Sequence, residues 1–331
     1  MSIHSQDSSI AFLLGAGFSV DAALDVNAPD SARYPMVSAL AKVCFDLDEP
    51  PHDKSIEELF QNAIYENNYE PLEKLYKQIM KADYDLTPQL LPGGCQQGNP
   101  YLKMLQDFPS APILTFNYDS LVEILLFNLG KWRPGNGYGI PVRVEHSFPF
   151  DSLAPLPENS LRTVLHLHGT LCVYKSEFDI EKGDSLDIGS SIKPKKEPSF
   201  SFDPGAITWC FPTYGSVASE IDFQYQRDRV IAPVPCKAEG LHGEFVSRIH
   251  MQALKIVQST RIIVSIGYSF NPHDRDSYVH FLDAAHGARI ILVTPEAHNI
   301  VSRLRAEHPK IKWQPISMTF REWVTQEYVG L

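Results

Sequence analysis

The sequence lacks any run of about 18 consecutive apolar residues, which is the length that a membrane-spanning helix needs. Its first nine residues are polar and do not show the basic and then apolar plan of a secretory signal. The first apolar stretch, residues 10–14, is too short to act as one. We therefore expect a protein of the cytoplasm that makes no contact with a membrane.

Paired cysteines are also missing. The chain has five cysteines, an odd number, and they are far apart. This spacing argues against a framework of disulfides. No two of them have the C-x-x-C spacing that favours structural zinc, so we expect no zinc site. The cysteines are Cys44, Cys95, Cys172, Cys210 and Cys236.

Positive charge is scarce. The 331 residues include 29 Lys and Arg against 40 Asp and Glu, which gives a formal net charge of -11. A protein that holds DNA or RNA through its phosphates needs clustered basic residues. The one basic cluster, residues 193–196, lies in a polar stretch that reads as solvated surface. We expect no direct binding of nucleic acid.

Short β-type runs alternate with helical patterns along most of the chain. This alternation predicts an α/β fold with a doubly wound, mainly parallel, Rossmann-like sheet that is covered on both faces. The expected strands are residues 10–14, 111–115, 163–167, 261–266, 288–293 and 311–316. The expected helices that follow them are residues 121–129, 245–257, 278–285, 300–305 and 319–328.

One α/β domain is predicted over residues 1–331. Residues 43–108 are mostly helical in pattern and interrupt the alternation, so they are expected to form a helical insertion. Within it, the apolar spacing over residues 56–80 suits helices with a break near Pro71. Residues 176–205 are rich in Ser, Asp, Lys, Gly and Pro and predict a long mobile loop.

Polar and glycine residues follow the expected strands, and ligands of open α/β sheets bind beyond the carboxyl ends of the strands. If these strands are neighbours, two glycine turns, an Asn, an Asp and a His face one crevice. The segments, in chain order, are Gly15-Ala16-Gly17-Phe18-Ser19, Thr115-Phe116-Asn117-Tyr118-Asp119, His166-Leu167-His168-Gly169, Gly267-Tyr268-Ser269 and Thr294-Pro295.

The first glycine turn has two readings. Gly15 and Gly17 would let the main chain approach a pyrophosphate, with the N–H groups of the next helix directed at it. Paired glycines more often only shape a tight turn. An ordinary dehydrogenase is disfavoured, because the third glycine of its fingerprint would fall at Val20.

The polar residues also have structural readings. Asn117 could cap the helix that starts near residue 121. His168 could be a satisfied histidine at the end of a strand. His166 and His168 lie on one strand face and could hold a metal, but no third ligand is evident.

Taken together and in this order, the motifs resemble those of the sirtuin family: G-A-G-x-S, T-x-N-x-D, H-G and G-x-S. The resemblance covers most of the chain and implies that it binds NAD. It implies that Gly15, Ala16, Gly17 and Ser19 hold the phosphates, and that Thr115 belongs to the ribose motif. It implies that Asn117 and Asp119 hold the nicotinamide ribose and an attacking water, and that His168 is the general base. Gly267, Ser269 and Thr294 match the positions that hold the adenosine half.

Departures from the family pattern point away from deacetylation. Family deacetylases carry a four-cysteine zinc module between H-G and G-x-S, where this chain has only three widely spaced cysteines. The peptide-binding F-G-E motif is missing, and residues 20–34 lengthen the segment after G-A-G-x-S. Residues 233–237, followed by a helix and the segment 266–270, are similar to a divergent bacterial branch of the family. That branch is associated with NAD-degrading anti-phage defence.

The resemblance therefore predicts an NAD hydrolase that releases nicotinamide and either ADP-ribose or a cyclic form of it. Two alternatives stay open: a protein deacylase, and a non-catalytic module that senses NAD or ADP-ribose. An NAD hydrolase without control would exhaust its own cell. We therefore expect a homo-oligomer or a partner subunit such as a HerA-like ATPase.

Overall fold

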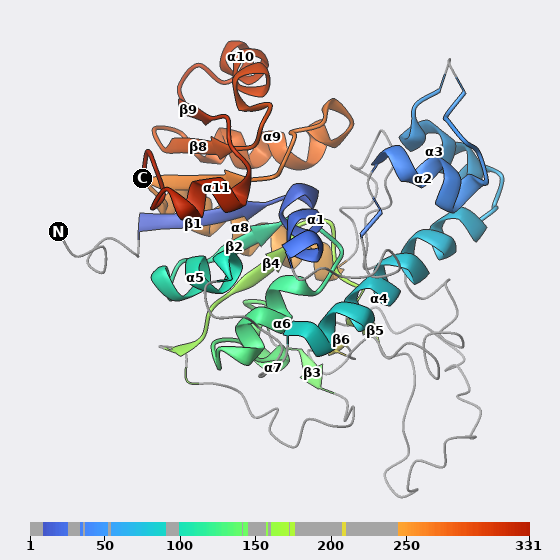
Figure 1. The fold of residues 1–331 in the computed structure, drawn as a ribbon, viewed down its shortest axis with the longest axis horizontal. Helices are drawn as coiled ribbons and strands as arrows, with labels where there is room; N and C mark the ends of the chain where they lie inside the picture. Colours follow the sequence, from blue (N-terminus) through green and yellow to red (C-terminus); the bar gives the residue numbers. More distant parts are fainter. Residues whose placement is uncertain are drawn as a thin grey trace, which may run out of the picture.

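The computed structural model describes residues 9–25, 34–35, 37–51, 54–90, 99–140, 142–144, 157, 160–171, 173–175, 207–209 and 244–331. Its main sheet has six strands in the order β4-β2-β1-β7-β8-β9, and every neighbouring pair is parallel (Figure 1). The strands are β1 (Ile10–Leu14), β2 (Ile113–Thr115), β4 (Val164–His166), β7 (Ile262–Ile266), β8 (Arg289–Val293) and β9 (Lys312–Ile316).

The central strands consist almost entirely of apolar residues. β1 reads IAFLL and is buried along its whole length, and β2 and β4 are buried throughout as well. Continuous apolar runs are typical of parallel strands that are covered on both faces. β9, at the edge of the sheet, reads KWQPI and is more exposed. It accommodates Pro315 because an edge strand tolerates a missing N–H.

Helices flank this sheet, as the alternating pattern predicts. They are α1 (Ala16–Asp25), α5 (Pro100–Asp107), α6 (Leu121–Asn128), α8 (Glu244–Ser259), α9 (Arg275–Ala284), α10 (Ala297–Glu307) and α11 (Phe320–Thr325), with the short α7 (Pro134–Gly137) and the 3-10 helix η8 (Pro272–Asp274). The Rossmann-like α/β prediction is confirmed. The expected strands that end at Leu14, Thr115 and Leu167 are adjacent and parallel.

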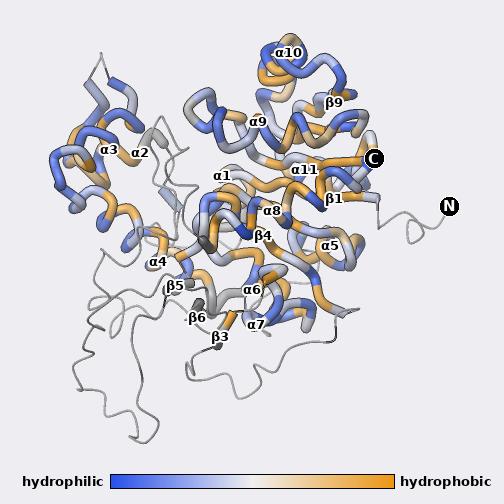
Figure 2. The backbone as a smooth tube through the Cα atoms, turned by 180° about the vertical axis from the view of Figure 1, so that it is seen from behind, coloured by the Kyte–Doolittle hydropathy of each residue, from blue (hydrophilic) through white to orange (hydrophobic). Residues whose placement is uncertain are grey.

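Aromatic side chains join helices that are far apart in the sequence. The rings of Phe18 in α1, Tyr101 in α5 and Phe320 in α11 have centroids 4.8 to 5.1 Å apart. Figure 2 shows the central strand β1 as hydrophobic, whereas the outer helices α3 and α10 have both hydrophobic and hydrophilic residues. The core therefore lies between the sheet and the helices packed on it.

Helices α2 (Val37–Phe45), α3 (Ile56–Tyr65) and α4 (Glu70–Leu90) form a lobe beside the sheet (Figure 1). Pro71 stands at the second position of α4, where its missing N–H costs nothing, so the expected break is present. The helical lobe begins before residue 43, and its standing as a separate insertion over residues 43–108 stays a prediction.

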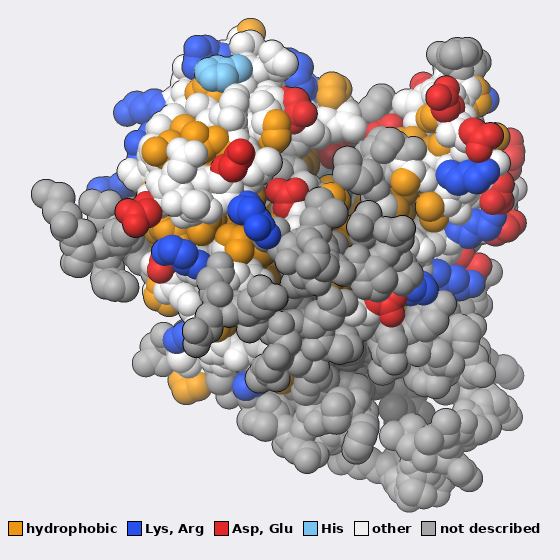
Figure 3. Space-filling view, viewed as in Figure 1, with side chains coloured by type: hydrophobic (Ala, Val, Ile, Leu, Met, Phe, Trp, Pro, Cys, Tyr) orange, Lys and Arg blue, Asp and Glu red, His pale blue; other side chains and the backbone are white. Residues whose placement is uncertain are grey.

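The surface of this lobe carries side chains of both signs (Figure 3). Lys74 lies 2.9 Å from Asp46 and 3.2 Å from Glu70; both carboxylates are largely exposed, whereas Lys74 is half-buried. Pairs of this kind contribute little to stability and are typical of a solvated face.

A second, three-stranded sheet was not predicted. It contains β3 (Arg143–Val144), β6 (Ile207–Trp209) and β5 (Val173–Lys175), in that order. The expected loop of residues 176–205 lies outside the described residues. Within the part of the chain that the structure describes, no helix has the length and apolar character to span a membrane.

Candidate functional site

The motif residues meet at one edge of the main sheet. Leu14 of β1 pairs in register with Thr115 of β2 and Ile266 of β7, and Thr115 pairs with His166 of β4. The strands are parallel, so their following residues emerge side by side. The G-A-G, T-x-N-x-D, H-L-H-G and G-x-S segments therefore share the carboxyl edge of the sheet, where α/β proteins bind ligands.

The two glycine turns pack main chain against main chain. The N–H of Gly15 donates to the carbonyl of Ile266 at 2.9 Å, and the N–H of Gly17 donates to the carbonyl of Gly267 at 3.1 Å. A Cβ on Gly15 would lie 2.5 Å from the Cα of Tyr268, and one on Gly267 would lie 2.5 Å from the N of Phe18. Close packing of the two turns is thus sufficient reason for these glycines.

This packing uses main-chain N–H groups of the first turn that could otherwise bind a phosphate. The N–H groups of Gly17 and Phe18 bind the carbonyls of Gly267 and Gly15, so they are not directed at a ligand. Ala16, the first residue of α1, is exposed at this position. The first turn of α1 contains no acidic residue, which keeps the positive end of the helix dipole available to an anion.

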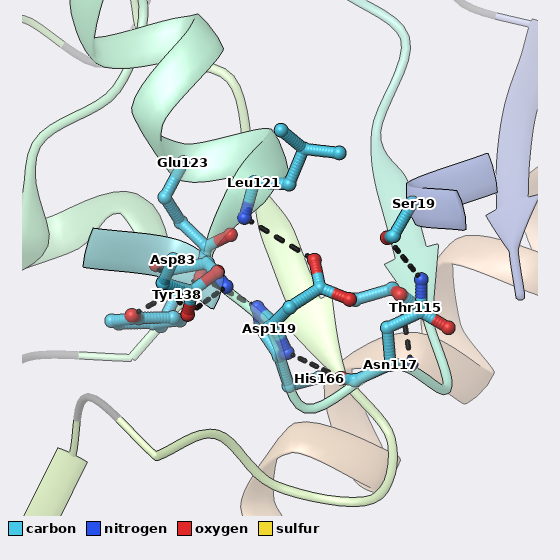
Figure 4. Close-up of polar contacts among 10 residues, drawn as sticks. Ser19, Asp83, Thr115, Asn117, Asp119, Leu121, Glu123, Tyr138 and His166 are labelled. Carbon is cyan, nitrogen blue, oxygen red and sulfur yellow. Dashed lines mark hydrogen bonds and ion pairs between the residues drawn. The ribbon is translucent and has the colours of Figure 1, made fainter. Parts of the chain in front are cut away.

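Asn117 does not cap a helix. Its Nδ2 donates to the carbonyl of Gly15 at 3.1 Å and to Oγ of Ser19 at 2.8 Å, and its main-chain N donates to Oγ1 of Thr115 at 3.0 Å (Figure 4). An amide nitrogen has two hydrogens, and both are used here. Any role of Asn117 toward a ligand therefore falls to Oδ1, which can only accept.

Asp119 contacts Ser19 and lies two residues before the start of α6. Its carboxylate accepts a hydrogen bond from the Ser19 hydroxyl, and its Oδ1 accepts from the N–H of Leu121 at 3.2 Å. Burial raises the pKa of Asp119, and the Glu123 charge adds to this, while the bonds from Ser19 and Leu121 oppose it. Asn117, Ser19 and Asp119 thus form one chain of hydrogen bonds.

His166 and Glu123 form a buried pair next to Asn117. Nε2 of His166 lies 2.6 Å from Oε1 of Glu123, and Nδ1 lies 2.9 Å from the carbonyl oxygen of Asn117. Tyr138 donates to the same Glu123 oxygen at 3.3 Å. His166 is therefore bound to protein groups at both ring nitrogens.

The described residues support no metal site. No group of three His, Cys, Asp or Glu in the described ranges is arranged to hold a metal ion. His166 binds Glu123 and the Asn117 carbonyl, whereas the ring of His168 packs against Phe116, with centroids 4.8 Å apart. The two histidines therefore have different surroundings.

His168 is buried at the end of β4, beside the aromatic residues of the neighbouring motifs. Phe116 packs against His168 and stacks on Tyr268 with centroids 4.3 Å apart. Nε2 of His250, on α8, donates to the carbonyl of Leu167 at 2.6 Å and so holds the turn that carries His168.

The G-x-S turn and Thr294 lie on the other side of β1. Arg303 on α10 donates to the carbonyls of Ser269 at 3.1 Å and Phe270 at 2.7 Å, and the side chain of Ser269 is exposed. Oγ1 of Thr294, which follows β8, donates to Glu296 at 3.1 Å. Phe270, whose carbonyl the Arg303 guanidinium binds, has a left-handed conformation with φ of 49°.

Helix α4 reaches this site through Asp83. Its Oδ1 accepts from the Tyr34 hydroxyl at 2.6 Å, and its Oδ2 accepts from N and Oγ of Ser120 at 3.1 and 3.0 Å. Burial raises the pKa of Asp83, and the Asp119 charge adds to this. The helical lobe is thus joined to the T-x-N-x-D loop by a buried carboxylate.

Sequence reasoning missed Glu123, Asp83, Arg303 and His250, and it considered His166 only as a metal ligand. One signal was present: Glu123 is the single charged residue in the apolar segment LVEILLFN. A lone carboxylate in such a helix requires a buried partner. The sequence did not indicate that this partner is His166.

No protein-family model matches the chain, and no curated protein is a significant match to its sequence. Solved structures of Sir2 homologues are similar to it. A mutant Sir2 homologue in complex with ADP ribose has 14% identity, covering 98% of this chain and 94% of that one, with a TM-score of 0.39. Sir2Tm bound to a propionylated peptide has 13% identity, covering 96% and 90%, with a TM-score of 0.37. A Sir2 complex with a p53 peptide and NAD+ has 12% identity, covering 96% and 90%, with a TM-score of 0.36.

Proposed function

We propose that the chain binds NAD at the carboxyl edge of its main sheet and hydrolyses the bond between nicotinamide and ribose. The observation that carries the proposal is the hydrogen-bond chain of Asn117, Ser19 and Asp119 beside the Gly15 turn. It fixes the Asn117 amide so that only Oδ1 remains to receive a ligand. The order of the motifs, which resembles that of sirtuins, supports NAD as this ligand.

The reaction needs a leaving nicotinamide, an attacking water and a proton acceptor. Nicotinamide departs from C1′ of the ribose with the bonding electron pair, through an oxocarbenium-like state, and water then bonds to C1′. Oδ1 of Asn117 accepts a hydrogen bond from this water or from a ribose hydroxyl and so holds the reacting groups in line. His168 takes the proton that the water loses, and ADP-ribose is the product.

Asp119 has a positioning role in this scheme. Its carboxylate holds the Ser19 hydroxyl, which in turn receives the Asn117 amide. Thr115 supports the same loop by accepting the Asn117 N–H. At the opposite end of the ligand, we propose that Gly267, Ser269 and Thr294 hold the adenosine half, and that Ala16 at the start of α1 faces the phosphates.

The experiment is to incubate the purified chain with NAD and measure nicotinamide release. Asn117→Ala and His168→Ala are expected to lose most of this activity. Asn299→Ala and His286→Ala, at exposed positions, are the matched controls and should keep it. Wild-type rates in either site variant would contradict the assigned roles. Release that depends on an added acylated peptide would favour a deacylase, and NAD binding without turnover would favour a sensor.

We also propose that the protein is free of zinc. Cys44 is buried in the core, and the other four cysteines lie outside the described residues. Metal analysis of the purified protein should find less than one equivalent of zinc. A stoichiometric zinc content would contradict this.

Control of the activity is proposed to come from assembly in the cytoplasm, in the setting of anti-phage defence. An NAD hydrolase that worked continuously would exhaust its cell, so a second copy or a partner such as a HerA-like ATPase should switch it on. Light scattering and rate measurements over a range of protein concentrations test this together. A monomer with full activity at every concentration would rule it out.

A further inference from the structure

Glu123 is a carboxylate inside an otherwise apolar helix. Helix α6 is buried from Leu121 to Leu126, and Glu123 is among its buried residues. A buried charge without a partner destabilises the folded protein. Removing one member of a buried pair is therefore destabilising, because the charge that remains has no compensating contact. The partner here is His166, the last residue of β4 (Figure 4).

The hydrogen bonds of His166 fix the number of protons that the pair holds. The Asn117 carbonyl, 2.9 Å from Nδ1, can only accept, so Nδ1 carries a hydrogen. Nε2 and Oε1 of Glu123 are 2.6 Å apart, which requires a second proton between them because two lone pairs would otherwise face each other. The pair is therefore an imidazolium with a carboxylate, or a neutral imidazole with a carboxylic acid. Its net charge is zero in both forms.

This pair holds the main-chain carbonyl of Asn117, and Thr115 holds its main-chain N–H. Gly15 and Ser19 hold its side-chain amide. We infer that Glu123 is a positioning residue for the proposed hydrolysis: through His166 it fixes the Asn117 carbonyl, and it does so only while the pair keeps its shared proton. The inference rests on the proposed function. It adds a residue that touches neither substrate nor water.

The surroundings of the pair favour the protonated state. Burial lowers the pKa of His166, but the charge and hydrogen bond of Glu123 and the Asn117 carbonyl raise it further, so its net shift is upward. Phe245 of α8, which packs on Tyr138, adds no charge. The ionisable groups around the pair come from the β2–α6 loop, α4, the segment before α2 and the end of α7: Asp119, Asp83, Tyr34 and Tyr138.

The direction of the pH effect follows. A histidine whose folded pKa is raised contributes fully at pH values below the unfolded pKa of about 6.5, and this contribution is lost as pH rises through the folded value. Above it, one proton remains for two hydrogen bonds. The carboxylate of Glu123 accepts more strongly than a carbonyl, so the bond from His166 to the Asn117 carbonyl is the one that is lost. The turnover number should then fall by about tenfold per pH unit, with KM changed less, because the ligand-binding turns around Gly15 and Gly267 do not contain the pair.

The test compares the wild type with Glu123→Gln. The Gln amide can donate to Nε2 of a neutral His166 whose Nδ1 still donates to Asn117, so this variant keeps both hydrogen bonds without the shared proton. It should retain its turnover number above the raised pKa of His166, where the wild type declines, and lose it at acid pH, where His166 becomes charged without a carboxylate. Glu123→Ala should lower the turnover number by about 100-fold at pH values below the wild-type decline. Glu307→Gln, at the end of α10, is the matched control and should follow the wild type.

A second readout does not depend on activity. In the wild type, the side-chain amide signals of Asn117 in an NMR titration should shift at the pH at which His166 titrates, and in Glu123→Gln this shift should move to acid pH. Identical pH profiles of turnover in the wild type and Glu123→Gln would overturn the inference, as would Asn117 signals that do not respond to His166. Coupled signals in a protein that releases no nicotinamide at any protein concentration, alone or with its partner, would support the positioning role and contradict the proposed hydrolysis.

Discussion

Replacing Gly267 with alanine should cost far more than replacing Gly287, although both glycines have positive φ. Gly267 has φ of 63°, and a new Cβ would lie 2.5 Å from the N of Phe18 and 2.8 Å from the Cα of Gly17. Gly287 has φ of 84°, and its Cβ would meet no atom within 4 Å. The two substitutions share the strain of the left-handed conformation, about 1–2 kcal/mol, and differ only in the steric contact.

A Cβ on Gly267 would meet only main-chain atoms, so no side-chain rotation can relieve the contact. Overpacking of this kind costs about 1–3 kcal/mol, so Gly267→Ala should lose about 2–5 kcal/mol in total and Gly287→Ala about 1–2 kcal/mol. Urea unfolding measured by circular dichroism gives both values from the same baseline. Equal losses would show that the two glycine turns do not press on each other. A loss of NAD binding without a loss of stability would assign Gly267 to the ligand instead of to packing.

Two further predictions concern residues that support the site from outside the motifs. Burial raises the pKa of Asp83. The stability that the protonated carboxyl contributes is therefore complete below about pH 4, the usual carboxyl pKa, and is lost as pH rises through the raised value. Asp83→Asn should therefore flatten the decline of the free energy of unfolding with pH, and an unchanged slope would refute the assignment. Arg303→Ala removes two hydrogen bonds to the carbonyls of Ser269 and Phe270, so KM for NAD should rise about tenfold or more with little change in turnover number. A fall in turnover number at constant KM would instead connect Arg303 with the chemical step.

The main sheet could be predicted because its strands are nearly continuous apolar runs, as in IAFLL, and each ends at a glycine or polar residue. Since carboxyl ends of parallel strands share one edge, the meeting of Gly15, Thr115 and Gly267 followed from that assignment. Element ends differed by a few residues, as for α9, which begins at Arg275 instead of residue 278. The strands of the second sheet have two or three residues each, too few for a periodic signal.

The supporting contacts could not be predicted because they join positions that the sequence does not relate. His166 and Glu123 are 43 residues apart, and Asp83 and Ser120 are 37 apart. A pattern of apolar residues places a helix against a sheet, but it does not fix which polar side chains meet across that contact. The packing of Gly15 against Tyr268 could not be predicted either. A glycine turn in the sequence does not indicate whether a ligand or another main chain approaches it.

In the proposed reaction, water held by Oδ1 of Asn117 replaces nicotinamide on the ribose. The most direct measurement is the product formed from NAD in oxygen-18 water, analysed by mass spectrometry for the wild type and Asn117→Ala side by side. We expect the wild type to release nicotinamide together with ADP-ribose carrying one heavy oxygen. Asn117→Ala, with NAD binding retained, should form this product at least about 100-fold more slowly. Labelled ADP-ribose formed at the same rate by Asn117→Ala, or nicotinamide release with no heavy oxygen in the product, would contradict it.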